Sequence, residues 1–568
     1  MTEAALSQPP LFTASSPHPL KFFLAALSLA AIIFAAIFPS LTLQEFSSTM
    51  ESLNVATALE IRRTNNWLIP TLQGETRLAK PPLAAWLTAS CISNDVMNSI
   101  SSPNADIRAE GYRMLARQVR TLSLLAACAM LVVTAYIGRV LADEHTGLLT
   151  LVITGTSLLF LRFARYSATD IHLTLWVTVT NLLLLKALLE RRWWLGFCGA
   201  GLSLALAMMS KGPVALLQSV IPLGIYTLIM PRGSGTRTRP VLPMLTGLFV
   251  FLVAGLLWYV LVLIKRPDAV SIWQNELSGY ASAEEGGKPW YTYFCIIPYM
   301  APWIAFFIVA LVAAVARRFD DRDRIALLLL LVPLIVMSFF HDRYERYLLP
   351  MFPIAGFISA RALMEHLRAN KWNAVDLAIN AIHWLIVISI TTGFPLAAGL
   401  GITKEVRRVD DTPWLPPTLG WTVAGVSALL ITIGIILQRR RPVAIVVVAA
   451  VLMLGMQHLF MMGYSNDEQG RATFRPMAEL IWQTAPDAEV FNAHPRGKRP
   501  PSDLALYLDR EVPWIKDPST LTPGRVAKVL LMLQDKGNPE PTPPPGFKPL
   551  ATQSRSGDRW WIFILPPQ

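Results

Sequence analysis

The chain has 568 residues, of which 53% are hydrophobic and only 15% are charged. A soluble protein carries about 25% charged residues, so this composition excludes an ordinary soluble protein and indicates an integral membrane protein. The formal net charge of +12 fits arginines that set topology and meet anionic lipid headgroups, and nucleic acid binding is not expected. The four cysteines show no CxxC spacing, so neither a disulfide framework nor a zinc cluster is indicated.

Long apolar segments predict an α-helical polytopic membrane protein with about 13 transmembrane helices, since each segment approaches the roughly 20 residues that cross a bilayer. The predicted spans are 21–41, 118–141, 146–163, 169–188, 194–210, 212–230, 241–264, 293–316, 324–340, 346–364, 378–402, 418–437 and 442–463. No small-residue cleavage site follows the first span, which argues against a signal sequence. The apolar stretch 81–95 is short, and we expect an in-plane or re-entrant helix there.

Arginine-rich connections predict the orientation, because short basic loops stay in the cytoplasm. Such connections follow the even-numbered spans, for example at 191–192, 317–324 and 439–441. The exception is the short 142–145 loop, which is acidic. The N-terminus is therefore expected in the cytoplasm and the C-terminal region outside.

The chain divides into three predicted parts. Residues 1–20 are polar and expected to be disordered. Residues 21–463 form the membrane domain, in which 42–117 is a large outer loop. Residues 464–568 are polar and rich in proline, and they predict a small outer α/β domain. Its expected strands are 488–492, 511–515, 527–533 and 559–565, and its expected helices are 471–485 and 502–508.

The first outer loop carries two candidate functional residues. Glu51 begins a stretch of helix-forming composition that ends near Arg63. Lys80 precedes two prolines, which hold its backbone extended. A lysine fixed at the outer interface can bind a lipid phosphate, although it can also be an interfacial lysine that only reaches toward water.

Two more candidates lie at predicted span boundaries. Asp170 opens the fourth span, where a boundary carboxylate is a functional candidate or a helix N-cap. Lys211 interrupts the apolar run in Ser210-Lys211-Gly212-Pro213, either as a phosphate ligand or as the lysine of a tight helical hairpin.

A dense charged segment at 341–347 lies between spans nine and ten, on the predicted outer side. Its Arg343, Arg346 and Tyr347 are candidate phosphate ligands. A salt-bridge network within the segment is the alternative. Carboxylates and cations thus converge on one face, which is the pattern expected of a site for a phosphorylated substrate.

Several motifs resemble a known family when they are taken together and in order. They are NWLIPTLQGETRLAKPPLAAWL at 66–87, ARYSATDIHLTL at 164–175, the SKGP break at 210–213, KPWYTY at 288–293 and RYLLPMFP at 346–353. The chain resembles the bacterial aminoarabinose transferase and protein O-mannosyltransferase superfamily, which has the C-type glycosyltransferase fold. The resemblance covers about residues 20–365. It implies thirteen spans, an active site on the outer face and a polyprenyl-phosphate-linked sugar as donor.

The chain also departs from the family pattern. Met50 stands where the family usually has an aspartate beside the acid that matches Glu51. Ala79 stands where the aminoarabinose branch has a glutamate that holds a metal with a histidine from the large outer loop, and residues 265–292 contain no histidine. These departures predict that this metal site is absent, and they argue against aminoarabinose transfer to lipid A. Carboxylates such as Glu276 could still recruit a hard cation.

The sequence therefore predicts a membrane glycosyltransferase that moves a sugar from a polyprenyl monophosphate to an acceptor hydroxyl on a lipid, glycan or protein. Glu51 is the first candidate for the general base and Asp170 the second. Lys80, Lys211, Arg343, Arg346 and Tyr347 are the candidates for holding the leaving phosphate. No cofactor is indicated. Two alternatives stay open: a transporter or flippase for a lipid-linked anion, and a family member that has lost catalysis and binds its ligand.

Overall fold

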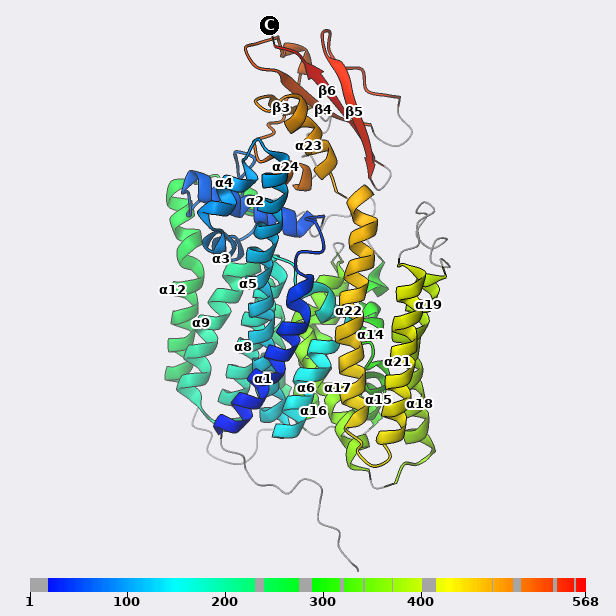
Figure 1. The fold of residues 1–568 in the computed structure, drawn as a ribbon. Coiled ribbons are helices and arrows are strands. Elements are labelled where there is room, and N and C mark those ends of the chain that lie inside the picture. The colour runs from blue at the N-terminus through cyan, green and yellow to red at the C-terminus, as the bar shows by residue number, and fades with distance from the viewer. Residues whose placement is uncertain are drawn as a thin grey trace, which may run out of the picture.

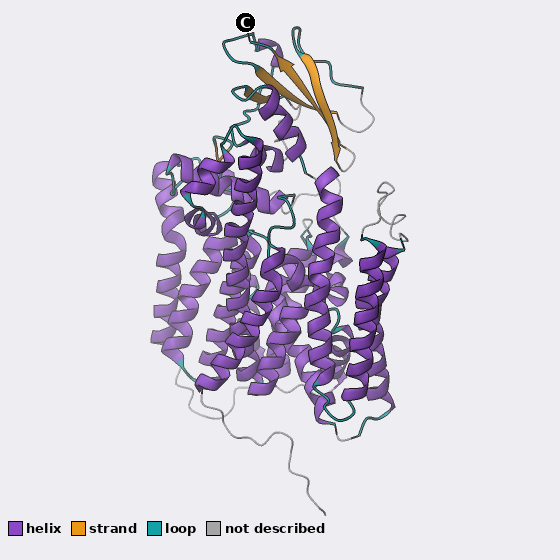
Figure 2. Cartoon of the chain, viewed as in Figure 1, coloured by secondary structure: helices purple, strands orange, loops and turns teal. Residues whose placement is uncertain are grey.

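Long apolar helices run side by side through the body of the molecule, and a small sheet domain lies at one end (Figures 1 and 2). We call the end that carries the sheet domain the outer end. The computed structural model describes residues 19–47, 49–229, 240–274, 289–316, 321–340, 343–369, 371–400, 415–471, 473–493, 502–534, 539–555 and 558–567. Most of the predicted disordered segment 1–20 lies outside these residues.

Nine described helical segments are long and apolar enough to cross a membrane, as judged by length and composition. They comprise α1 (Pro19–Ile37) with η1 (Phe38–Ser40), α5 (Ala105–Leu141), α8 (Thr169–Glu190), α9 (Trp193–Lys211), α12 (Val241–Lys265), η3 (Glu345–Met351) with α17 (Phe352–Arg368), α18 (Ala374–Ile388) with η4 (Ser389–Gly393) and α19 (Phe394–Gly399), α21 (Pro417–Leu437), and α22 (Ala444–Arg471). The prediction of a polytopic helical membrane protein is confirmed.

The four other predicted spans are broken or more charged, so the count of thirteen stays a prediction. They correspond to α6 (Glu144–Thr156) with α7 (Leu158–Phe163), to α10 (Val214–Leu217) with α11 (Val220–Ile229), to η2 (Trp290–Cys295) and α14 (Ile296–Tyr299) with α15 (Ile304–Ala316), and to α16 (Asp321–Ser338). Extended backbone at Ser157 separates the first pair. The third group bends by 119° and can be counted as a tenth span.

Short elements of the first outer loop cover the outer end of the bundle (Figure 1). They are α2 (Thr49–Thr64), the two-residue strands β1 (Thr71–Leu72) and β2 (Glu75–Thr76), α3 (Leu83–Cys91) and α4 (Asn94–Ile100). With nine residues, α3 is about 13 Å long and too short to span a bilayer. By contrast, α5 has 37 residues, or about 55 Å, so it extends beyond an apolar core of about 30 Å.

The C-terminal domain is a four-stranded sheet with the strand order β3-β4-β6-β5. Its elements are α23 (Arg475–Thr484), β3 (Glu489–Asn492), α24 (Ser502–Leu508), η5 (Pro518–Thr520), β4 (Lys528–Gln534), β5 (Lys548–Arg555) and β6 (Asp558–Leu565). β3 and β4 are parallel, whereas β6 is antiparallel to both β4 and β5.

Three details of the outer region differ from the prediction. The segment 511–515 makes only an isolated bridge, between Trp514 and Asn492, because Pro513 has no N–H to donate to a ladder. The strand β5 was not predicted, since its polar sequence KPLATQSR lacks apolar alternation. The helix α22 continues to Arg471, beyond the predicted end of the last span at 463.

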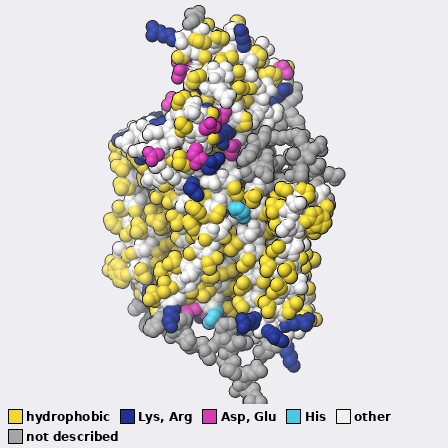
Figure 3. Space-filling model, in the orientation of Figure 1, with side chains coloured by type: hydrophobic (Ala, Val, Ile, Leu, Met, Phe, Trp, Pro, Cys, Tyr) yellow, Lys and Arg dark blue, Asp and Glu magenta, His cyan; other side chains and the backbone are white. Residues whose placement is uncertain are grey.

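One hydrophobic core joins the outer loop to the C-terminal domain. It includes Val55 and Leu59 of α2, Leu504 of α24, Val529 of β4 and Ile562 of β6. The bundle shows the opposite pattern on its outside, where large apolar side chains are exposed, as a bilayer requires. In Figure 3 apolar side chains cover the bundle, while lysines and arginines gather at its lower end and at the junction with the sheet domain.

Candidate active site

Asp170 forms the centre of a buried charged cluster at the outer end of the bundle. It lies in the first turn of α8, whose N-cap is Ala168 and has no side-chain cap, so Asp170 is not the N-cap. Its Oδ1 is bound by Lys211 at the end of α9. Its Oδ2 lies 3.6 Å from Nε of Arg346 on η3. Side chains from α8, α9 and η3 therefore meet here. The carboxylate partner of Arg346 lies outside its own charged segment, 341–347.

Aromatic rings cover the two cations of this cluster. Nζ of Lys211 lies 4.1 Å from the centre of the Tyr347 ring. The guanidinium carbon of Arg346 lies 4.1 Å from the Tyr344 ring centre and 5.3 Å from that of Tyr347. Ring faces attract cations without neutralising them, so Asp170 is the group that offsets the charge of both cations.

Lys80 belongs to the same charged region, since its charge and that of Arg346 both act on Lys211. Three cations thus accompany one carboxylate, Asp170, among these groups. Lys211 and Arg346 share the single charge of Asp170, which leaves one positive charge in excess at this carboxylate, and an anion with several acceptor oxygens would balance it.

Several buried polar atoms on α8 and on the elements beside it have no protein hydrogen-bond partner. Along the described part of α8 they are Thr169 Oγ1, Asp170 Oδ2, His172 Nε2, Trp176 Nε1 and Asn181 Oδ1, and from neighbouring elements they are Gln218 Oε1, Tyr293 OH and Arg346 Nε. Most buried polar groups in proteins have partners. Asp170 Oδ2 and Arg346 Nε belong to the charged cluster itself, so the first can accept a hydrogen bond from a polar ligand and the second can donate one.

Glu51, the other predicted catalytic carboxylate, lies in a different environment. It is fully buried, and Arg120 of α5 binds both of its oxygens at 2.8 Å. Glu51 Oε1 also accepts the backbone N–H of Ser167 at 3.0 Å. The remaining donors of Arg120 reach the carbonyls of residues 41, 44 and 45, so all five guanidinium donors are used.

A second buried arginine holds the segment between these two carboxylates. Arg165 donates to Ser40 Oγ at 3.0 Å and to the Leu161 carbonyl at 2.9 Å, and it also binds Gln457. Burial lowers the pKa of Arg165 to about 10. The Arg165 side chain therefore ties the start of this segment to the first span and to α22.

Among the predicted ligands, the structure brings Lys211, Arg346 and Tyr347 to Asp170. Arg343 donates instead to the carbonyl of Ser338, at 2.7 and 3.1 Å. Arg120, Tyr344 and Ser167 were not predicted as site residues. Arg120 could have been suspected, because a charge near the start of a predicted span needs a buried partner.

The described residues contain no group of three or more histidine, cysteine, aspartate or glutamate side chains suited to a metal ion. Glu276 lies outside the described residues. Ala79 offers no ligand beside Lys80. The prediction about the metal therefore still needs an experiment.

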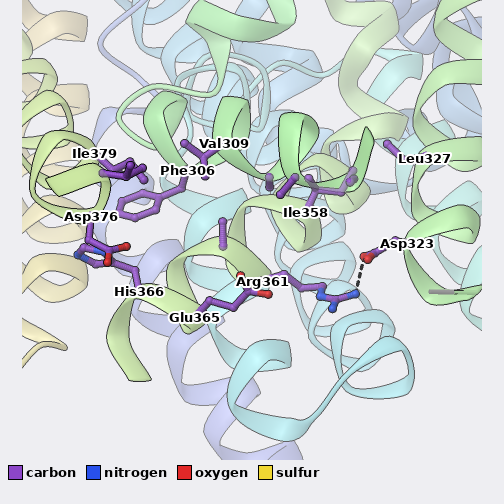
Figure 4. Close-up of a pocket in the computed structure, with 15 residues that line it drawn as sticks. Phe306, Val309, Asp323, Leu327, Ile358, Arg361, Glu365, His366, Asp376 and Ile379 are labelled. Carbon is purple, nitrogen blue, oxygen red and sulfur yellow. Dashed lines mark hydrogen bonds and ion pairs between the residues drawn. The ribbon is translucent and has the colours of Figure 1, made fainter. Parts of the chain in front are cut away.

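A cavity of about 250 Å³ lies at the other end of the bundle, between α15, α16, α17 and α18. Figure 4 shows its charged side, where Arg361 pairs with Asp323 while Glu365, His366 and Asp376 lie nearby. No predicted site residue lines this cavity, which separates it from the cluster around Asp170.

Two family descriptions match adjoining parts of the chain. The dolichyl-phosphate-mannose-protein mannosyltransferase family matches residues 114–259, and the Alg9-like mannosyltransferase family matches residues 274–410. The first match contains both α8 and α9, which supply Asp170 and Lys211.

Curated relatives include two bacterial proteins named undecaprenyl phosphate-alpha-4-amino-4-deoxy-L-arabinose arabinosyl transferase. The one from Pectobacterium carotovorum is 26% identical over 354 residues, which are 59% of each chain. The one from Pectobacterium atrosepticum is 25% identical over 65% of this chain and 68% of its own length. The match thus spans about three fifths of the first relative and two thirds of the second.

The fold matches that of ArnT from Cupriavidus metallidurans along nearly the whole chain. The crystal structure with undecaprenyl phosphate has a TM-score of 0.66 and 16% identity, and the match covers 96% of this chain and 98% of that one. The apo structure has a TM-score of 0.68. The fold is shared with ArnT, and the family matches and the relatives together support membership of the C-type glycosyltransferase superfamily.

Proposed function

We propose that this protein is a glycosyltransferase of the bacterial inner membrane that uses a polyprenyl-phosphate sugar as its donor. The sugar, a hexose or a pentose, goes to a hydroxyl of a lipid, glycan or protein at the outer face. The observation that carries the proposal is the pairing of two cations, Lys211 and Arg346, with the one carboxylate of Asp170, with the charge of Lys80 acting on Lys211. The likeness to ArnT, whose structure holds undecaprenyl phosphate, supports a lipid phosphate as the anion.

In this proposal the cations bind the donor phosphate and stabilise it as it leaves. Lys211 and Arg346 already bind a carboxylate, and a phosphate offers the same kind of acceptor oxygen with more charge. Tyr347 packs against Lys211 and keeps its ammonium at the site. The leaving group is a stable phosphate anion, so the bond to the sugar breaks without a general acid.

We propose Asp170 as the general base. A donor phosphate competes for Lys211 and Arg346, which weakens their hold on Asp170 and makes this carboxylate more basic. Asp170 then takes the proton of the acceptor hydroxyl while the acceptor oxygen bonds to the anomeric carbon and the bond to the phosphate oxygen breaks. Glu51 is less suited to this role, because Arg120 and Ser167 already bind it.

The test is to incubate the purified protein with radiolabelled undecaprenyl-phosphate sugars of several kinds and with a membrane extract. At least one sugar should move to an acceptor, and the Lys211→Ala variant should fail to move it. If the protein binds undecaprenyl phosphate but consumes no donor in the panel, the proposal of transfer is refuted in favour of a binding protein.

A further inference from the structure

A continuous chain of polar contacts connects the C-terminal domain to the backbone just before Asp170. It begins at β5, where Gln553 donates to the Thr473 carbonyl at 2.7 Å. The hydroxyl of Thr473 donates to Glu45 Oε2 at 2.6 Å, and Arg475 of α23 donates to Glu45 Oε1 at 2.7 Å. Both carboxylate oxygens of Glu45 are thus bound by the C-terminal domain, Oε1 by Arg475 and Oε2 by Thr473.

The turn around Glu45 carries this connection inward. Tyr507 of α24 accepts the backbone N–H of Phe46 at 2.9 Å, so the C-terminal domain holds the turn at two neighbouring residues. On the other side, Arg120 donates to the carbonyls of Gln44 at 2.5 Å and Glu45 at 3.1 Å. The turn therefore lies between the C-terminal domain and the guanidinium that binds Glu51.

Ser167 is the end of the chain of contacts and is held by several groups. Its N–H donates to Glu51, and its carbonyl accepts from the Asn54 amide at 3.0 Å. Its hydroxyl lies 3.3 Å from that of Thr88. Since Ser167 is three residues before Asp170, these contacts fix the direction in which the chain enters α8 and therefore where the Asp170 carboxylate points.

We propose that Glu51 and Arg120 are positioning residues, and that through Glu45 and Arg475 the C-terminal domain sets the geometry of Asp170. The domain is then a working part of the active site. The expected effect on the rate of transfer rests on the proposed function. The expected effect on the backbone around Ser167 can be measured without any sugar transfer.

Glu45→Gln and Arg475→Gln are suitable test variants, since both side chains are partly exposed, at 18% and 23%, and neither change leaves a fully buried charge. The matched control is Asp509→Asn. It removes a different ion pair between the first outer loop and the C-terminal domain, that of Arg63 with Asp509, which lies outside the path from Glu45 through Arg120 and Glu51 to Ser167.

Hydrogen–deuterium exchange of residues 164–171 in the full-length protein is the first measurement. Glu45→Gln and Arg475→Gln should speed the exchange of the Ser167 amide by about tenfold, because opening costs less free energy once the anchor is lost. Asp509→Asn should leave it unchanged. Equal exchange in all three variants and the unaltered protein would overturn the inference.

Steady-state transfer is the second measurement. A small displacement of Asp170 should lower kcat by about tenfold to a hundredfold, while KM for the donor changes by less than twofold and the pH at which the rate is half-maximal stays the same. A loss that falls on KM alone, or one that Asp509→Asn reproduces, would contradict a positioning role. If the unaltered protein transfers no sugar, the proposed function fails, whereas the exchange result still decides whether the C-terminal domain holds Ser167.

Discussion

Two buried carboxylates near the outer end of the bundle have opposite surroundings. Glu51 is bound by Arg120 and Ser167, and every donor of that arginine is used. Asp170 shares two cations, yet its Oδ2 and Nε of Arg346 make no protein hydrogen bond. The comparison teaches that an ion pair whose hydrogen-bonding groups are all used holds the fold together. An ion pair with unused hydrogen-bonding groups and excess positive charge is instead suited to exchanging partners with a ligand.

The largest expected effect concerns Asp170. Asp170→Asn keeps the shape of the side chain and removes the base, so turnover should fall by roughly 10²–10⁴-fold. Donor binding should stay near its original strength, since the cations remain. The measurement is kcat with a donor from the radiolabelled panel. Full turnover in Asp170→Asn, together with loss in Glu51→Gln, would reverse the roles assigned to the two carboxylates.

A second effect should appear in stability. Arg120→Leu leaves Glu51 buried without its cation, which should lower the free energy of unfolding by about 3–5 kcal/mol. Lys211→Ala should cost less, because Arg346 still accompanies Asp170. Thermal unfolding of both variants in the same detergent checks this order. An Arg120→Leu variant as stable as the unaltered protein would show that Glu51 is not held as described.

A smaller effect is expected at Lys80. Lys80→Ala removes a charge-assisted contact with the donor phosphate, worth about 1.5–3 kcal/mol or roughly a tenfold to a hundredfold loss of donor use. Lys80→Arg should rescue this only in part, since a planar fork replaces a point charge. The ratio kcat/KM for the donor reports both changes. Unchanged kcat/KM at preserved protein level would remove Lys80 from the site.

The smallest effect is expected from chelation. The family resemblance implies a metal-binding glutamate and histidine, but this chain has Ala79 at the first position and no histidine in residues 265–292. Transfer should therefore continue in the presence of a strong chelator. Complete loss of transfer that added divalent metal restores would contradict this expectation.

The sequence predicted the cluster of Asp170, Lys211 and Arg346 because antiparallel helices bring alternate span boundaries to the same face of a membrane. It did not predict the partner of Glu51, because Arg120 is 69 residues away and their contact depends on how α5 packs against the outer loop. The polar path through Arg475 was also beyond prediction, since it crosses between regions more than 400 residues apart.

The fold was predictable where the length of an apolar segment determines a helix. It was less predictable where a break in the backbone divides such a segment. Most long helices lie within a few residues of their predicted spans, but α5 begins at Ala105 instead of 118 and α22 ends at Arg471 instead of 463. The separation of α6 from α7 at Ser157 depends on local backbone geometry inside an otherwise apolar run. The strand β5 depends on pairing with β6 and not on its own polar residues.

The most direct test of the central claim is the binding of undecaprenyl phosphate to the purified protein in a neutral detergent. Lys211 and Lys265 are matched, as they end the neighbouring helices α9 and α12, but only Lys211 touches Asp170. Lys211→Ala should weaken binding by about tenfold or more, and Lys265→Ala should leave it unchanged. Equal affinity in both variants and the unaltered protein would contradict a donor phosphate site at Asp170.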